Sequence, residues 1–358
     1  MNSSASLPSA FGILPGDLRG FSLKNDVGYL FGRMQRIRSW KNESPDLGAE
    51  GKAFLAEHFD FTLPRVVKTM PSTDGSTKLV LALADGSEIE CVHMPRDVKN
   101  PRVTMCLTSQ VGCGMGCTFC ATAQMGFKRN LTASELVAQV LVMVRDLGPE
   151  ESQRISLVFM GMGEPLQNLD NVLRACHILS HSKGLGIPLN RMTVSTSGLV
   201  PQIDKLGKSP MRPTLAVSLN ATTDVVRSRI MPVGRTWDLL SLKDALHRFP
   251  LLPREKLTIE YVLLGDENDT DDDADRLADF ARSFRHNLNL IPFNAWNGSG
   301  HREPTEEAIQ RFVKRMQNAG CLVTVRRSRG RDVAAACGQL VQLRSTPGHA
   351  VRKTRANA

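Results

Sequence analysis

Apolar residues recur in two different patterns near the start of this chain. In residues 16–70 apolar side chains stand singly among polar ones, a spacing typical of amphipathic helices. Residues 78–84 and 87–94 are instead strand-like runs, and they flank Asp85-Gly86, the dipeptide favoured in type I′ hairpin turns. We therefore expect a small helical region followed by a β-hairpin.

From residue 102 onward, short aliphatic or β-branched runs alternate with helical segments. One helical segment begins with a capping box formed by Thr132 and Glu135, and Gly148 is expected to end it. Strands that alternate with helices form parallel sheets through right-handed crossovers. The pattern therefore predicts an α/β fold, a partial (β/α) barrel whose ligands lie at the C-terminal ends of its strands. The predicted strands are residues 103–107, 155–160, 192–195, 215–219, 257–264, 288–293 and 322–325.

These patterns divide the 358 residues into four parts. We expect a helical accessory domain at residues 1–75, a β-hairpin linker at 76–98, the barrel at 99–340 and a basic tail at 341–358. A chain of this length can bury a core large enough to fold without disulfide or metal crosslinks.

Composition narrows the class of protein. No apolar run reaches the roughly 20 residues that a membrane-spanning helix needs, and Met1 to Pro15 lack the basic start and apolar core of a secretory signal. We therefore expect a cytosolic monomer that does not contact membranes. In that reducing compartment the 8 cysteines do not form a disulfide framework, and clustered cysteines indicate metal binding or catalysis. The formal net charge of +9 favours a polyanionic partner such as RNA.

Three cysteines form a compact motif directly after the first predicted barrel strand. Cys113, Cys117 and Cys120 have the spacing C-x3-C-x2-C. A structural zinc site takes four ligands, so a zinc ion here would have to borrow a distant His or Cys. Three thiolates alone suit a [4Fe–4S] cluster with one iron open to a small molecule. The spacing favours the cluster and leaves zinc as the alternative.

The three-cysteine loop and its surroundings resemble a known family. From about residue 90 to residue 340 the chain is similar to the radical S-adenosylmethionine (SAM) RNA adenine-C2 methyltransferases, the RlmN family. The motifs that carry the resemblance are CLTSQVGC at 106–113, GFKRNLT at 126–132, GMGEPL at 161–166, STSG at 195–198 and AAACGQL at 334–340.

The resemblance implies a mechanism with two cysteines outside the three-cysteine loop. The cluster on that loop would bind and cleave SAM, while Cys337, methylated beforehand by another SAM, would link through its methyl carbon to C2 of an adenine. Glu90 would accept the C2 proton, and Cys106 would release the product by forming a transient disulfide with Cys337. By residue type alone, both cysteines could instead be inert buried thiols, and Glu90 a solvated charge on an edge strand.

The family pattern also implies a set of SAM contacts, each at or just after the end of a predicted strand. Many family members have His where this chain has Asn220, although asparagine also donates and accepts hydrogen bonds. Gly161 to Gly163 could alternatively be only a tight turn from strand to helix. The implied contacts are Gly163, Glu164, Ser195, Ser218, Leu219, Asn220 and Asn294.

Basic residues gather on both sides of Cys337 and after the three-cysteine loop. We expect them to contact RNA phosphates, which supply affinity but little sequence choice. The resemblance implies two substrates, the peptidyl-transferase loop of 23S rRNA and the adenosine 3′ of the anticodon in some tRNAs, and a flavodoxin-type electron donor. The basic residues are Arg326, Arg327, Arg329, Arg331, Arg352, Lys353, Arg355, Lys128 and Arg129.

Two other functions fit the same residues. A related class methylates C8 of an rRNA adenine with the same five cysteines and confers antibiotic resistance, and a non-catalytic RNA-binding protein would use an iron–sulfur or zinc site structurally. The remaining cysteines, Cys91, Cys176 and Cys321, are expected to be structural. The acidic run at 269–275 is expected to begin a helix, where negative charge is favourable, rather than to bind a cation.

Overall fold

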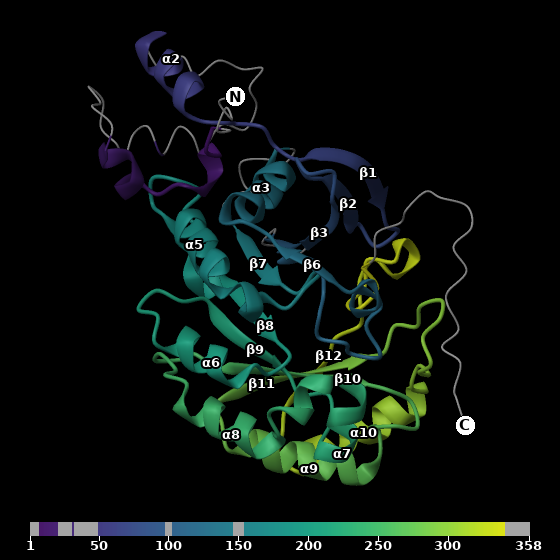
Figure 1. The fold of residues 1–358 in the computed structure, drawn as a ribbon. Coiled ribbons are helices and arrows are strands. Elements are labelled where there is room, and N and C mark those ends of the chain that lie inside the picture. The colour runs from purple at the N-terminus through teal and green to yellow at the C-terminus, as the bar shows by residue number, and fades with distance from the viewer. Residues whose placement is uncertain (1–6, 21–30, 32–48, 97–101, 146–153, 341–358) are drawn as a thin grey trace.

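A single ten-stranded sheet forms the centre of the structure (Figure 1). The computed structural model describes residues 7–20, 31, 49–96, 102–145 and 154–340. The strands are β1 (Arg65–Pro71), β2 (Thr77–Ala82), β3 (Glu88–Arg96), β4 (Arg102–Cys106), β7 (Ile155–Phe159), β8 (Met192–Thr196), β9 (Thr214–Ser218), β10 (Leu257–Leu263), β11 (His286–Pro292) and β12 (Val323–Val325).

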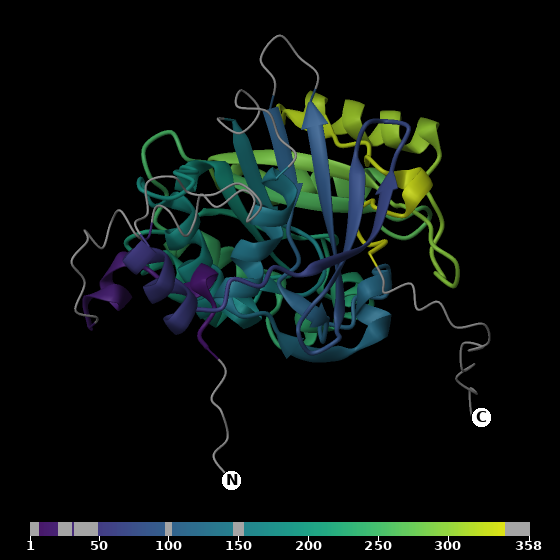
Figure 2. The ribbon, with the colours of Figure 1, turned by 90° about the horizontal axis from the view of Figure 1, so that it is seen from above.

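The order of the strands makes this sheet an open barrel. From β4 onward all neighbours are parallel, in the order β4-β7-β8-β9-β10-β11-β12. The antiparallel strands β1, β2 and β3 continue the sheet beyond β4. Because β1 lies at one edge and β12 at the other, the curved sheet does not close, as the view from above shows (Figure 2).

Helices cover the outer face of this sheet, and apolar side chains fill the space between the two layers (Figure 1). In α10 (Glu306–Asn318) the side chains of Ile309, Phe312 and Met316 are buried. Phe312 stacks on Tyr261 of β10 with 5.8 Å between ring centroids. The helices are α2 (Ala49–His58), α3 (Ala133–Val144), α5 (Leu169–Ser180), α6 (Val200–Gly207), α7 (Asp224–Ile230), α8 (Leu239–Arg248), α9 (Asp271–Arg282) and α10 (Glu306–Asn318), with short 3-10 helices η1 (Ala10–Gly12), η2 (Pro15–Gly20), η3 (Ala121–Met125), η4 (Pro165–Asn168), η5 (Leu189–Arg191), η6 (Pro232–Arg235) and η7 (Arg331–Val333).

The barrel predicted from the sequence is confirmed, since each of the seven predicted strands has its counterpart among β4 and β7 to β12. The capping box of Thr132 and Glu135 begins α3, while Gly148 lies outside the described residues. The acidic run begins α9, where Thr270 and Asp273 form a second capping box. None of the helices in the described part of the chain is both long and apolar enough to cross a bilayer.

The region before the barrel differs from the expectation in two respects. Residues 65–71, placed in the helical segment, form β1. That strand is exposed along nearly its whole length, so it lacks the alternation of buried and exposed residues by which a strand is recognised. The predicted hairpin is present as β2 and β3, yet β3 pairs with β4. The hairpin is therefore part of the barrel sheet and not a separate linker. The basic tail lies outside the described residues.

Removing the Phe312 ring should destabilise the fold strongly, because this side chain is fully buried against Tyr261. We expect Phe312→Ala to lower the free energy of unfolding by about 3–5 kcal/mol. Leu322→Ala is the matched control, since Leu322 is 86% exposed, and it should change stability by less than about 0.5 kcal/mol. Urea denaturation followed by circular dichroism measures both, and equal losses would contradict this description of the core.

Candidate functional site

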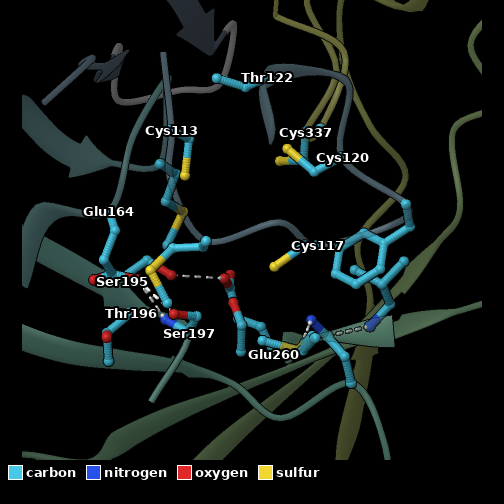
Figure 3. A pocket seen from close by; sticks show the side chains of 18 of the residues that line it. Cys113, Cys117, Cys120, Thr122, Glu164, Ser195, Thr196, Ser197, Glu260 and Cys337 are labelled. Atoms are coloured by element: carbon cyan, nitrogen blue, oxygen red, sulfur yellow. Dashed lines mark hydrogen bonds between the residues drawn. The ribbon is translucent and has the colours of Figure 1, made fainter. Parts of the chain in front are cut away.

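A pocket opens at the C-terminal ends of the parallel strands (Figure 3). It collects most of the residues predicted for the cluster and for SAM: Cys113, Cys117, Cys120, Gly163, Glu164, Ser195, Ser218, Asn220, Asn294 and Cys337. Leu219, Cys106 and Glu90 are not among its lining residues. Further lining residues that the sequence did not indicate include Met160, Thr196, Ser197, Glu260 and Phe293.

The three-cysteine loop is closed at its base by a small second sheet. Strand β5 (Gln110–Gly112) pairs antiparallel with β6 (Phe127–Asn130), and the backbone N–H of Cys113 donates to the carbonyl of Gly126 at 2.9 Å. Gly112 has φ +77°, and a Cβ there would lie only 1.9 Å from the carbonyl oxygen of Gly126. Only glycine therefore allows the two sides of the loop to approach this closely.

The three sulfur atoms of this loop face one cavity (Figure 3). Burial raises the pKa of the Cys113 thiol to about 12 and raises those of Cys117 and Cys120, with mutual repulsion adding to the effect at Cys113 and Cys117. Thiolates here therefore need a cationic partner. Among the described residues, no three His, Cys, Asp or Glu side chains are placed to hold a metal ion. The loop fits an iron–sulfur cluster better than a single ion, because each thiolate of such a cluster binds a different iron atom.

The segment after β7 brings a buried carboxylate to the pocket. Glu164 is 3% exposed, and its two carboxylate oxygens accept hydrogen bonds from Leu166 N–H at 3.0 Å and from the N–H and hydroxyl of Ser197, both at 2.8 Å. Burial raises the pKa of Glu164, while these hydrogen bonds oppose the shift. These bonds hold the Glu164 carboxyl group in one place, and in its ionised form it can accept an ammonium group.

Two glycines allow the same segment to lie against residues 107–110, which lead from β4 into β5. A Cβ on Gly161 would lie 2.7 Å from the carbonyl oxygen of Leu107, and one on Gly163 would lie 2.5 Å from Cβ of Gln110. Gly163 also has φ +100°, which L-residues rarely adopt. The turn is therefore tight, as the sequence also suggested, and it places Glu164 at the pocket.

Glu260 in the middle of β10 connects several pocket residues. Its carboxylate accepts a hydrogen bond from the Ser195 hydroxyl at 3.4 Å and pairs with Arg326 at 3.2 Å. The Glu260 side chain is only 7% exposed. The sequence contained a signal for Glu260, because it is the one acidic residue in the apolar run 257–263. A carboxylate in a buried strand needs a partner, so its position indicated a specific contact.

Asn220 and Leu219 form hydrogen bonds that stabilise the wall of the pocket. Asn220 has φ +56°, a conformation that asparagine tolerates better than most residues. Its side-chain oxygen accepts from Val262 N–H at 2.9 Å, and its amide group lies 3.3 Å from the sulfur of Met231. Leu219 is fully buried, and its N–H donates to the carbonyl of Glu260 at 2.9 Å.

Two further cysteines lie outside the three-cysteine loop: Cys337 lines the pocket, and Cys106 does not. Cys106 ends β4, and it packs with Ala335 of the Cys337 loop, by which we mean residues 330–338. Burial raises the pKa of Cys106 to about 12, with the charge of Cys337 adding to the rise and that of Arg326 opposing it. Burial also raises the pKa of Cys337, which Arg326 again opposes. The two sulfurs and one guanidinium therefore interact electrostatically, and all eight cysteines are free thiols.

The Cys337 loop is attached to both neighbouring parts of the site. Asn294, at the end of β11, donates from its amide to the Cys337 carbonyl at 3.4 Å and to the Ser328 hydroxyl at 2.8 Å. The N–H of Ala121, next to the three-cysteine loop, donates to the carbonyl of Gly338 at 2.8 Å. In Figure 3 Cys337 lies beside Cys120 at the rim of the pocket.

Glu90 is buried, so the interpretation of a solvated edge-strand charge is wrong. It lies on β3, between β2 and β4, and its carboxylate is 3.3 Å from the ammonium group of Lys78, with both side chains fully buried. Lys78 was not among the predicted site residues. Its position two residues before Val80, within an apolar strand that alternates in burial, was the available signal.

The basic residues before Cys337 are balanced by carboxylates. Arg327 pairs with Glu306 at 2.6 Å and Arg331 with Glu303 at 2.5 Å, while Arg329 lies 3.7 Å from Asp74. After the three-cysteine loop, Arg129 pairs with Asp85 and with Glu135, both at 2.8 Å. These arginines support local structure, and RNA contact by them stays a prediction. Arg352, Lys353 and Arg355 lie outside the described residues.

The other three cysteines are buried, as expected. Cys176 on α5 and Cys91 on β3 are fully buried, and burial raises the pKa of each thiol. Cys321 is 3% exposed and its sulfur lies 3.8 Å from the carbonyl oxygen of Ala278.

Comparison with known proteins defines the class of enzyme. The radical SAM superfamily matches residues 107–281. A solved structure of a radical SAM methyltransferase from Sphaerobacter thermophilus superposes with a TM-score of 0.84 at 36% identity, covering 93% of this chain and 99% of that one. The open barrel and its three-cysteine loop are therefore those of a radical SAM methyltransferase.

Two relatives identify the family within this class of enzyme. The dual-specificity RNA methyltransferase RlmN of Syntrophobacter fumaroxidans is 43% identical over 324 residues, covering 90% of this chain and 92% of the relative. The protein of the same name from Lawsonia intracellularis is 46% identical over 294 residues, covering 81% and 82%. The chain belongs to the RlmN family of radical SAM methyltransferases. This confirms the resemblance seen in the motifs, and the family implies SAM and a [4Fe–4S] cluster as cofactors.

The close approach at Gly163 leads to a stability prediction. We expect Gly163→Ala to lower the free energy of unfolding by about 2–4 kcal/mol, because the new methyl group meets Gln110 in a strained backbone conformation. Gly86→Ala is the matched control, with φ +77° and no atom within 4 Å of the added Cβ, and it should cost about 1 kcal/mol. Urea denaturation compares the two variants, and a loss at Gly163 no larger than at Gly86 would be inconsistent with the close packing.

Proposed function

We propose that this enzyme methylates C2 of adenosine in 23S rRNA and in some tRNAs, through a methylated Cys337. The observation that carries the proposal is the second thiol pair, Cys106 and Cys337, beside a pocket that the three-cysteine loop lines. A SAM-binding barrel alone would not need these two thiols. The names of the relatives, dual-specificity RNA methyltransferases, support the substrate class.

The cofactors would be held by the residues that line the pocket. Cys113, Cys117 and Cys120 would ligate the cluster, and Glu164 would accept the ammonium group of SAM. The backbone at Gly163 and the polar side chains of Ser195, Ser218, Asn220 and Asn294 complete the proposed SAM site, with Leu219 shaping it from behind. When bound, the cluster and SAM supply an electron, a methyl group and the radical needed at an unreactive aromatic carbon.

Cys337 would carry the methyl group to the RNA. Its flanking residues, Ala334 to Ala336 and Gly338, are small and leave space for a nucleotide. The charge of Arg326 opposes the burial that raises the pKa of the Cys337 thiol, so it favours the thiolate that accepts a methyl group. The same guanidinium acts on Cys106.

Glu90 and Cys106 would complete the reaction. Once the carbon on Cys337 is joined to adenine, Glu90 takes the C2 proton and the adduct returns its unpaired electron to the electron-transfer partner, which leaves a closed-shell thioether. The Cys106 sulfur then attacks the Cys337 sulfur, so that a disulfide forms while the bond from sulfur to carbon breaks, and the carbon takes up a proton to become the methyl group. An external thiol must afterwards reduce the disulfide.

The proposed partners follow from this chemistry. The target adenine has to leave its stack to reach the pocket, which favours RNA loops and single-stranded segments. We propose that the N-terminal region and the basic tail help to bind the RNA. A flavodoxin-type protein would supply electrons, and the enzyme would act as a cytosolic monomer.

Nucleoside mass spectrometry tests the reaction directly. In cells that lack the gene, rRNA and tRNA should lack 2-methyladenosine, and complementation should restore it. Cys337→Ala should abolish the product because no other residue carries the methyl group, whereas Cys176→Ala, a buried cysteine on α5, should retain it. Detection of 8-methyladenosine would overturn the C2 assignment, and product from Cys337→Ala would overturn the intermediate.

Replacing the resolving thiol should stop the reaction one step later. We expect Cys106→Ala to accumulate a covalent complex between protein and RNA, since the bond from Cys337 to the methylated carbon can then not be broken. Denaturing gel electrophoresis with labelled RNA detects the complex, and the double variant Cys106→Ala/Cys337→Ala is the control that should show none. If Cys106→Ala released methylated RNA at the normal rate, resolution by a disulfide would be ruled out.

A further inference from the structure

The turn between β1 and β2 holds the Cys337 loop from outside. The Ser72 hydroxyl donates to a carboxylate oxygen of Asp332 at 2.6 Å, and Thr73 N–H donates to the other oxygen at 3.0 Å. Gly330 N–H donates to the carboxylate of Asp74 at 2.7 Å. The loop (yellow) lies beside the β1–β2 hairpin (dark blue) in both Figure 1 and Figure 2. Two segments 260 residues apart in the sequence are thus joined by hydrogen bonds.

The buried ammonium group of Lys78 lies behind this turn. Lys78 of β2 is fully buried, and its Nζ lies 3.3 Å from the carboxylate of Glu90 and donates to the carbonyl of Ala334 at 3.1 Å. Ala334 has φ +49°, a left-handed conformation unusual for alanine, and it precedes Cys337 by three residues. Lys78 therefore binds both the proposed proton acceptor and the loop of the proposed methyl carrier.

The contacts of Lys78 with Glu90 and with the Ala334 carbonyl are shielded from water, so losing either one is costly. A buried carboxylate that loses a cationic partner tends to become protonated or to move, since an uncompensated charge is costly in a medium of low polarity. Glu90 can accept a proton only while it is ionised. An unsupported left-handed alanine would also tend to return to an ordinary backbone conformation, which would shift Cys337.

We propose that Lys78 is a positioning residue that keeps Glu90 ionised and fixes the Cys337 loop through the carbonyl of Ala334. One ammonium group then fixes the position of the proton acceptor relative to the loop that bears the methyl carrier. The inference rests on the proposed function, because it assigns Lys78 a task within that reaction.

Two substitutions at this position separate the two tasks. Lys78→Gln removes the charge but leaves an amide that can still donate to Ala334. We expect it to retain Cys337 methylation, while release of methylated RNA falls about 100-fold, the typical contribution of a general base, and the covalent complex accumulates. Lys78→Met removes both bonds, so methylation of Cys337 should fall as well. Lys78→Arg, which restores charge and donors, should recover at least about a tenth of the activity.

The experiment uses the full chain with its cluster reconstituted, SAM and a transcript of the 23S rRNA peptidyl-transferase region. Intact-protein mass spectrometry reports Cys337 methylation, denaturing gels report the covalent complex, and nucleoside analysis reports the product. Lys314→Met, an exposed lysine on α10, is the matched control and should behave like the unchanged protein. Glu90→Gln combined with Lys78→Gln should be no slower than Glu90→Gln alone, because Lys78 is proposed to act through Glu90.

The outcomes are distinct. Release of methylated RNA by Lys78→Gln within a few-fold of the normal rate would overturn the proposal, as would an equal loss at every step without the covalent complex, which would indicate a merely structural lysine. If Lys78→Met fails to fold, Lys78→Gln and Lys78→Arg still decide. If the unchanged protein itself forms no methyladenosine, the proposed function is rejected and the role of Lys78 with it, whereas product from the unchanged protein leaves only Lys78 in question.

Discussion

Burial of charged groups at the mouth of the barrel is the constraint on which the site depends. Three carboxylates and several thiols lie there away from water, and each carboxylate has a specific partner: Ser197 and a backbone N–H for Glu164, Ser195 and Arg326 for Glu260, and Lys78 for Glu90. Because buried ions without partners are costly, these contacts fix the side chains in one arrangement. The same burial raises the pKa of the thiols and makes them dependent on a bound cation or on Arg326.

The connectivity of the sheet satisfies this constraint with residues from both ends of the chain. Since β3 pairs with β4, Glu90 and Cys106 come from neighbouring strands, and the β1–β2 turn reaches the Cys337 loop from the other side. The three-cysteine loop and the Cys337 loop are joined by the bond from Ala121 N–H to the Gly338 carbonyl. The proposed cofactor site and the proposed methyl carrier are therefore joined by a backbone hydrogen bond rather than by a shared helix or strand.

The sequence predicted the parts of this structure that leave a periodic or a motif signal. The seven barrel strands, the turn at Asp85-Gly86 and the residues around Cys113 fall in this class. It did not predict β1, because an exposed edge strand has no apolar alternation. It also missed Lys78 and Glu260. Their places in apolar strands indicated burial, but the sequence did not show which residues pair with them, because Glu90 lies 12 positions from Lys78 and Arg326 lies 66 positions from Glu260. The arginines before Cys337 suggested free positive charge, and their neutralisation depends in the same way on distant residues such as Glu306 and Asp74.

The place of β4 in the sheet has a consequence for how the chain can be divided. In many (β/α) barrels the strands close on themselves, whereas here β4 has β7 on one side and β3 on the other. A fragment that began at the sequence-predicted barrel boundary, residue 99, would leave the backbone groups along one side of β4 without partners. Such a strand readily pairs with another chain, so the fragment would be prone to aggregate. The hairpin of β2 and β3 thus also covers this side of β4, and a chain cut back to residue 99 would need another segment to pair with it.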